Sequence, residues 1–227
     1  MRYLLYSFCV AITFIACNPS KSYELTEREK HLCDSLKIDQ EIIKELREVS
    51  ASNVEAFHYS LSRMYSEGKE IELDPVYLEG LVFDEKHSES YETVFALKDK
   101  FRAKGYSIFL LDNNFDIGGK ADRLAILKTT DKYEILSNIR TNGANYNIDP
   151  DSLITIIKDF DKKYSLELIG ASGDWCEFIV HNEKTDWRQL AKEAYAVCPD
   201  IVDQGTGTIL ALERELRMTK RLYFWWD

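Results

Sequence analysis

The sequence predicts an α+β fold, in which helices pack on a mostly antiparallel sheet in two layers. Segments with apolar residues at helical spacing alternate with short apolar runs of strand length, and Ser172-Gly173 separates two such runs as a hairpin turn does. From residue 123 onward the expected order is strand, helices, strand, strand, helices, strand, which is the chain order of a ferredoxin-like sheet. A hydrophobic content of 45% with 30% charged residues is ordinary for a globular core.

The first part of the chain is predicted to be helical and then irregular. Two helices are expected over 24–49, followed by a connector over 50–87 that contains one or two strands. A third helix is expected to stop at Gly105, where glycine lets the backbone leave the helical conformation. The predicted N-terminal caps of these helices are Thr26 or Ser22, Asp39, and Ser88.

The rest of the chain alternates strands and helices. Strands are expected over 106–111, 124–127, 166–169, 175–180 and 221–226. The predicted helix caps between them are Thr130, Asp149, Asp186 and Thr208. Asp149-Pro150 is the strongest of these signals, because aspartate accepts a free backbone N–H and proline has no N–H to leave unbonded.

The first seventeen residues have the features of a bacterial lipoprotein signal. Arg2 precedes an apolar run over 3–16, which is shorter than the about 20 residues that a bilayer core requires, and small Ala16 precedes Cys17. Cleavage before Cys17 would leave this cysteine to carry a lipid such as palmitate. The sequence therefore predicts a membrane-anchored lipoprotein of the bacterial cell envelope, facing the periplasm or the surface. The alternative, a core strand, fits poorly with the charge at position 2 and the polar run after Cys17.

The predicted organisation follows from these segments. It comprises a signal peptide at 1–16, a tether at 17–23, a helical and irregular extension at 24–104, and an α+β domain at 105–227. The membrane is thus one expected partner, reached through the N-terminal lipid.

Charge and cysteine content restrict the other partners. The formal net charge of −10 repels nucleic acid, so none is expected, and a protein partner is left open. Without Cys9 and Cys17, the chain keeps Cys33, Cys176 and Cys198. Three thiols cannot all pair, and an oxidising envelope permits one disulfide without requiring it. The alternative for Cys176 and Cys198 is burial as small hydrophobic residues.

Four stretches carry a resemblance to a known family. They are TNGANY at 141–146, GASGDWCEF at 170–178, CPDIVDQGTGT at 198–208 and LYFWWD at 222–227, and we call them the family segments. On these segments, the chain from about residue 105 to 227 resembles the family called domain of unknown function 4253. The resemblance implies no established activity, substrate or cofactor, and it assigns no catalytic residue.

The densest polar stretch is the loop over 200–208. Asp200, Asp203 and Gln204 could supply oxygen ligands to a hard cation or act as a general base. The alternative is a structural turn after Pro199, in which the two glycines permit positive φ. The sequence favours the structural turn.

Aromatic residues beside carboxylates mark the other candidate binding positions. Trp225 and Trp226 next to Asp227 could form a platform for a sugar, a peptide or a partner protein, and Asp174 with Trp175 raises the same question. Neighbouring strand residues point to opposite faces, so at most one of Trp225 and Trp226 belongs to the core face. The alternative is that helices or the N-terminal extension cover the other ring.

No motif indicates a particular reaction. The four histidines have no metal-ligand spacing, and nucleophile-elbow and phosphate-loop motifs are absent, so the sequence predicts no metal and no cofactor. A nucleophilic Cys198 is disfavoured, because the C-terminal end of a helix raises a thiol pKa. The sequence therefore favours a non-catalytic binding module, of which an immunity-type protein that neutralises a basic toxin is one version. The alternative is an envelope hydrolase or metal-dependent enzyme that uses Asp200 and Asp203.

Overall fold

A computed structural model describes residues 23–60, 63–66, 69–74, 76–114 and 117–226. The predicted signal peptide, Cys17 and Asp227 lie outside the described residues, so the expectations about them remain predictions. Among the described helices, none is both long enough and apolar enough to cross a membrane.

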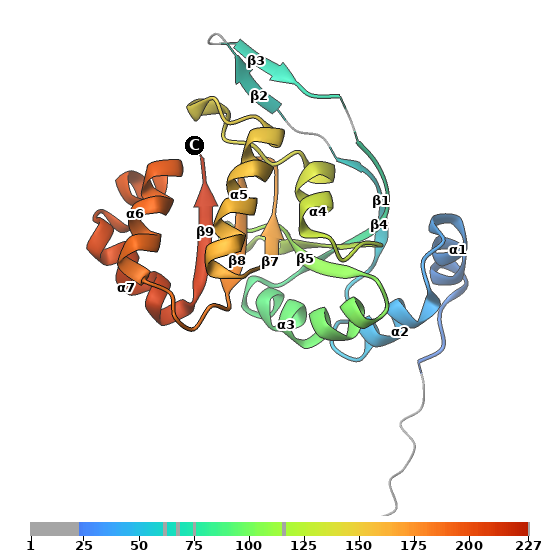
Figure 1. The fold of residues 1–227 in the computed structure, drawn as a ribbon. Helices are drawn as coiled ribbons and strands as arrows, with labels where there is room; N and C mark the ends of the chain where they lie inside the picture. Colours follow the sequence, from blue (N-terminus) through green and yellow to red (C-terminus); the bar gives the residue numbers. More distant parts are fainter. Residues whose placement is uncertain (1–22, 61–62, 67–68, 75, 115–116, 227) are drawn as a thin grey trace, which may run out of the picture.

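A seven-stranded sheet forms the centre of the fold, in the order β1-β4-β6-β5-β7-β8-β9 (Figure 1). Its strands are β1 (Glu55–Ser60), β4 (Val76–Glu85), β5 (Ser107–Asp112), β6 (Asp122–Leu127), β7 (Leu166–Ala171), β8 (Trp175–Val180) and β9 (Arg221–Trp225). Neighbouring strands are antiparallel, except that β5 pairs with β7 in parallel. A separate hairpin of β2 (Arg63–Ser66) and β3 (Lys69–Glu72) projects from one end of the molecule (Figure 1).

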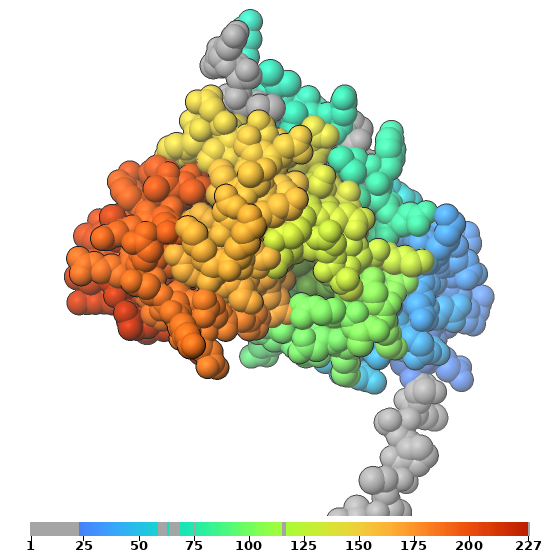
Figure 2. All heavy atoms as spheres, viewed as in Figure 1, coloured from blue at the N-terminus to red at the C-terminus, as the bar shows by residue number. Residues whose placement is uncertain are grey.

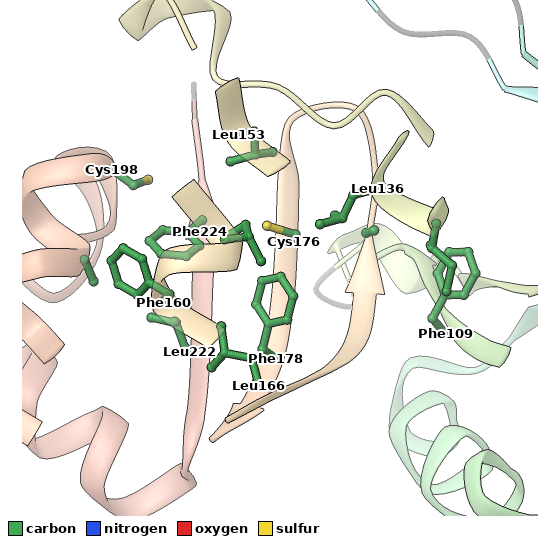
Figure 3. Packing of buried hydrophobic residues seen from close by; sticks show 14 of the residues in the cluster. Phe109, Leu136, Leu153, Phe160, Leu166, Cys176, Phe178, Cys198, Leu222 and Phe224 are labelled. Atoms are coloured by element: carbon green, nitrogen blue, oxygen red, sulfur yellow. The ribbon is translucent and has the colours of Figure 1, made fainter. Parts of the chain in front are cut away.

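Helices cover both faces of the sheet. One face packs on α1 (Glu27–Leu36), α2 (Gln40–Arg47) and α3 (His87–Ala103). The other packs on α4 (Lys132–Ile139), α5 (Pro150–Tyr164), α6 (Trp187–Val197) and α7 (Ile209–Thr219). In this second core the Phe224 ring meets the Phe160 ring edge-on at 5.5 Å between centroids (Figure 3). Figure 2 places the N-terminal helices, in blue, and the C-terminal helices, in orange to red, at opposite ends of the molecule.

The α+β class and the mostly antiparallel sheet are confirmed. The N-terminal helices add a third layer to the predicted two, because the extension folds against the open face of the sheet. The chain order from β6 to β9 is also the predicted one. The order in the sheet departs from a ferredoxin-like arrangement, because β5 lies between β6 and β7. Ile108, Phe109 and Leu110 of β5 are at most 3% exposed, and a strand that is apolar on both faces belongs at the centre of a sheet.

Most predicted helix starts are confirmed. The side chains of Thr26, Asp39, Asp149, Asp186 and Thr208 each accept a hydrogen bond from a backbone N–H of the following turn. Two predictions were wrong. Ser88 lies inside α3, which begins at His87 without a side-chain cap, and Asp131 rather than Thr130 caps α4. The predicted connector over 50–87 supplies two strands of the main sheet, β1 and β4.

Candidate functional site

The family segments converge at one corner of the sheet. The Asn142 side-chain amide donates to the carbonyl oxygen of Gly173 at 3.2 Å. The backbone N–H of Trp226 donates to the carbonyl oxygen of Asp174 at 3.0 Å. The Trp226 ring lies on Gly143, where an added Cβ would come within 2.9 Å of the indole. Only glycine therefore fits beneath this tryptophan.

A second tryptophan repeats this packing on the neighbouring strands. The Trp175 ring lies on Gly170, where an added Cβ would come within 2.5 Å of the indole. Trp175 pairs with Trp225 across β8 and β9, and the Cys198 thiol donates to the Trp225 carbonyl oxygen at 2.9 Å. The family segments thus hold the ends of these strands in one fixed arrangement.

A cleft of about 670 Å³ opens beside this corner. The family segments line it with Asp174, Trp175, Glu177, Gly205, Tyr223 and Trp225, and α7 contributes Glu215. The start of α3 and the end of β5 also line the cleft, with His87, Tyr91 and Asp112. The cleft therefore combines residues from the C-terminal part with residues from the N-terminal extension.

Glu177 of β8 is the most deeply buried ionisable group in this lining. Its side chain is 7% exposed, its Oε2 accepts a hydrogen bond from the Tyr91 hydroxyl at 2.6 Å, and its Oε1 lies 3.2 Å from Nη1 of Arg221. The Arg221 guanidinium also lies over the Tyr91 ring, 4.6 Å from the centroid. Three side chains from α3, β8 and β9 thus form one connected group, which we call the Glu177 cluster.

Burial dominates the electrostatics of this cluster. It raises the pKa of Glu177 above the ordinary value, although the Tyr91 hydrogen bond and the Arg221 charge act in the opposite direction. Burial and the neighbouring Glu177 carboxylate also raise the pKa of Tyr91. Burial raises the pKa of Tyr223, on the same strand as Arg221, to about 12. A buried carboxyl group with a raised pKa in a cleft is a recognised mark of a functional site.

A histidine and a carboxylate lie beside this cluster. His87 Nδ1 is 2.8 Å from Oδ2 of Asp122, which is fully buried. The same oxygen accepts a hydrogen bond from the Ser90 hydroxyl at 2.6 Å, and the other Asp122 oxygen accepts the backbone N–H of Asn114 at 2.8 Å. Asp122 therefore fixes the orientation of the imidazole, whose Nε2 is the nitrogen left for a ligand.

The predicted site residues fall into different places. Asp174, Trp175 and Trp225 line the cleft, whereas Trp226 on the opposite face of β9 is buried in the core. Gln204 is exposed and contacts the loop carboxylate Asp200 rather than the cleft. Asp227 is outside the described residues.

The two loop carboxylates do not share a site. Asp200 is buried and accepts hydrogen bonds from the Tyr146 hydroxyl at 2.6 Å and from Gln204 at 3.1 Å. Asp203 is exposed and accepts one from the Tyr195 hydroxyl at 3.2 Å. Neither lines the cleft, and among the described residues no three or more His, Cys, Asp or Glu side chains are placed to hold a metal ion.

The three cysteines of the described chain, Cys33, Cys176 and Cys198, are free and buried. Burial raises the pKa of Cys33 and of Cys198 to about 11. These thiols are small core residues in this structure.

Sequence reasoning missed the Glu177 cluster and the His87–Asp122 pair. Glu177 lies inside a family segment, which was the one available signal. Tyr91 is 86 positions from Glu177 in the chain and belongs to no motif. Only the folded sheet brings such residues together.

The fold and the cleft define an α+β domain with a ligand-sized site at one end of its sheet. Residues 123–227 match the model of the family described as Domain of unknown function (DUF4253), and this part of the chain is a domain of that family. The resemblance inferred from the sequence is thereby confirmed, with a boundary within β6 instead of near residue 105. Comparison with curated proteins and with solved structures gave no match.

Proposed function

We propose that this protein is a ligand-binding lipoprotein of the bacterial cell envelope, anchored through Cys17, and that its ligand occupies the cleft beside Glu177. The cleft carries the proposal, because its volume of about 670 Å³ is that of a small-molecule site and the family segments supply half of its described lining residues. The anchor rests on the apolar run that ends in Ala16-Cys17. An immunity-type role would be one form of this function, supported by the acidic charge alone.

The lining suits recognition rather than a particular reaction. The partly exposed side chains of Tyr91, Tyr223 and Trp225 offer aromatic contact area, and the Glu177 cluster supplies fixed polar groups at one position. Ligand sites are commonly built from such apolar walls with a few placed polar groups.

The test is a cleft-blocking variant. Gly205 lines the cleft, its φ is not in the left-handed region, and an added Cβ would have only ordinary contact with the Asp200 carbonyl oxygen at 3.7 Å. Gly205→Trp therefore adds a large side chain to the cleft lining without backbone strain. Leu210→Trp is the matched control, since Leu210 is 56% exposed and does not line the cleft.

Thermal melts of the full-length protein in detergent against a panel of amines, amino acids, sugars and short peptides provide the measurement. The proposal expects at least one compound to raise the melting temperature of the parent and of Leu210→Trp but not of Gly205→Trp. Compounds that stabilise all three proteins equally would place binding outside the cleft.

The His87–Asp122 pair favours a second candidate function, acid–base catalysis in the same cleft. A buried carboxylate that orients an imidazole, beside a carboxyl group with a raised pKa, is an arrangement that catalytic sites use. Mass spectrometry of a bound compound after incubation separates the two functions. An unchanged mass supports binding alone, whereas a product that His87→Gln no longer forms supports catalysis.

A further inference from the structure

The charges of the cleft lining are strongly unequal. Among the described residues, four carboxylates line it, those of Asp112, Asp174, Glu177 and Glu215, against one guanidinium, that of Arg221. Arg221 is already engaged with Glu177 at 3.2 Å and with the Tyr91 ring. The cleft therefore attracts cations and repels anions.

The aromatic walls of the cleft point to the same kind of ligand. Arg221 over Tyr91, at 4.6 Å, is a cation held against an aromatic face inside the cleft. Tyr223 and Trp225 lie on the same strand as Arg221 and are only partly buried, so their rings remain available for similar contacts. Aromatic faces attract organic cations through the same electrostatic interaction.

Glu177 provides an independent observation. This carboxyl group is 7% exposed, and its burial raises its pKa. The hydrogen bond from Tyr91 and the charge of Arg221 lower the pKa, but together they do not offset the effect of burial. A further positive charge in the cleft would stabilise the ionised form. The aromatic side chains of the same lining favour an organic group as the carrier of this charge.

We infer that the cleft binds a ligand in which an amine or guanidinium group is attached to an apolar or aromatic body. The inference rests on the proposed function, because it names the chemical class of ligand for the same cleft. A free small molecule and a lysine or arginine side chain of a peptide share this chemistry.

Three probes with the same ring test the charge requirement: 2-phenylethylamine, 2-phenylethanol and 3-phenylpropionate. Calorimetric titration of the full-length protein is expected to detect the amine alone, with affinity that falls as salt is raised. Asp174→Asn combined with Glu215→Gln is expected to weaken amine binding about tenfold, because two nearby charges are lost. Glu72→Gln combined with Glu183→Gln removes the same charge at exposed positions outside the cleft and is expected to leave binding unchanged.

A peptide arm distinguishes the two sources. Acetylated tripeptides with central lysine, arginine or acetyl-lysine are titrated under the same conditions, and a basic peptide that binds more tightly than the free amine indicates a protein partner. Failure of every amine and basic peptide to bind overturns the inference. If 2-phenylethanol or 3-phenylpropionate binds instead, and Gly205→Trp abolishes this binding, the cleft is a ligand site but the inferred class of ligand is wrong.

Discussion

Tyr91→Phe isolates one hydrogen bond of the Glu177 cluster. The substitution keeps the ring beneath Arg221 and removes the hydroxyl, which donates to Glu177 at 2.6 Å and accepts a longer hydrogen bond from the Asn113 amide at 3.4 Å. A buried hydrogen bond to a charged group contributes about 1.5–3 kcal/mol, so we expect the free energy of unfolding at pH 7 to fall by about 2 kcal/mol. Urea denaturation followed by circular dichroism measures this change.

The same variant has a predicted pH dependence. As the pH falls through the raised pKa of Glu177, its carboxylate becomes neutral. The loss in free energy of unfolding caused by Tyr91→Phe should then shrink to about 1 kcal/mol, the value for a neutral hydrogen bond. Tyr223→Phe is the matched control, because it deletes a hydroxyl in the same cleft and should change stability by less than about 0.5 kcal/mol. A Tyr91→Phe loss that equals the control, or that stays constant between pH 7 and pH 4, would refute the reasoning.

Three further predictions follow from the same residues. The pKa of Glu177 in the folded state lies above the ordinary 4.5, so its contribution to the free energy of unfolding falls as the pH rises from 4.5 through that pKa. Glu177→Gln should remove this pH dependence in urea titrations. A free-energy difference between parent and variant that stays constant with pH would contradict the prediction. Cys17→Ser should abolish incorporation of labelled palmitate, and equal labelling of parent and variant would exclude the anchor. The double variant Asp200→Asn with Asp203→Asn should lose about 1–2 kcal/mol of stability in thermal melts, because Asp200 loses buried hydrogen bonds. A melting temperature that calcium or magnesium raises in the parent but not in the variant would indicate a metal site instead.

Local chemistry made much of the secondary structure predictable. Asp149-Pro150 and Asp186 begin helices because their carboxylates satisfy free N–H groups within three residues. The opposite orientation of Trp225 and Trp226 follows from the alternation of a strand, and the two rings pack against the cores on opposite faces of the sheet. These features depend on neighbours in the sequence, which a single sequence contains.

The site depends on neighbours that the sequence does not reveal. Tyr91 and Arg221 meet Glu177 only because β5 enters the centre of the sheet and α3 crosses its face. The loop over 200–208 attracted attention by its polar composition, yet its carboxylates contact Tyr146 and Tyr195 outside the cleft. The structure forms a short π-helix over Ile201–Thr206 here instead of the predicted turn. Composition therefore identified polar residues but could not distinguish those in a cleft from those that only stabilise a local element.

The division near residue 105, predicted from the sequence, crosses a continuous sheet. β4 pairs with β6 along the whole length of β6, and α3 packs on the same face as Leu124 and Ile126. A fragment over 105–227 would lose both elements and would also lose Tyr91 from the Glu177 cluster.

The cost of that loss can be compared with the stability of a domain. Ile108, Leu110, Leu124 and Ile126 are at most 3% exposed in the full chain, and exposing each would cost about 1.5–3 kcal/mol, or roughly 6–12 kcal/mol together. A typical domain is stable by only about 5–15 kcal/mol. We therefore expect the fragment to lack a cooperative thermal transition and to bind the dye 1-anilinonaphthalene-8-sulfonate, while the full chain melts cooperatively. A fragment that melts cooperatively near the temperature of the full chain would show that the C-terminal part folds by itself, and that the extension only completes its cleft.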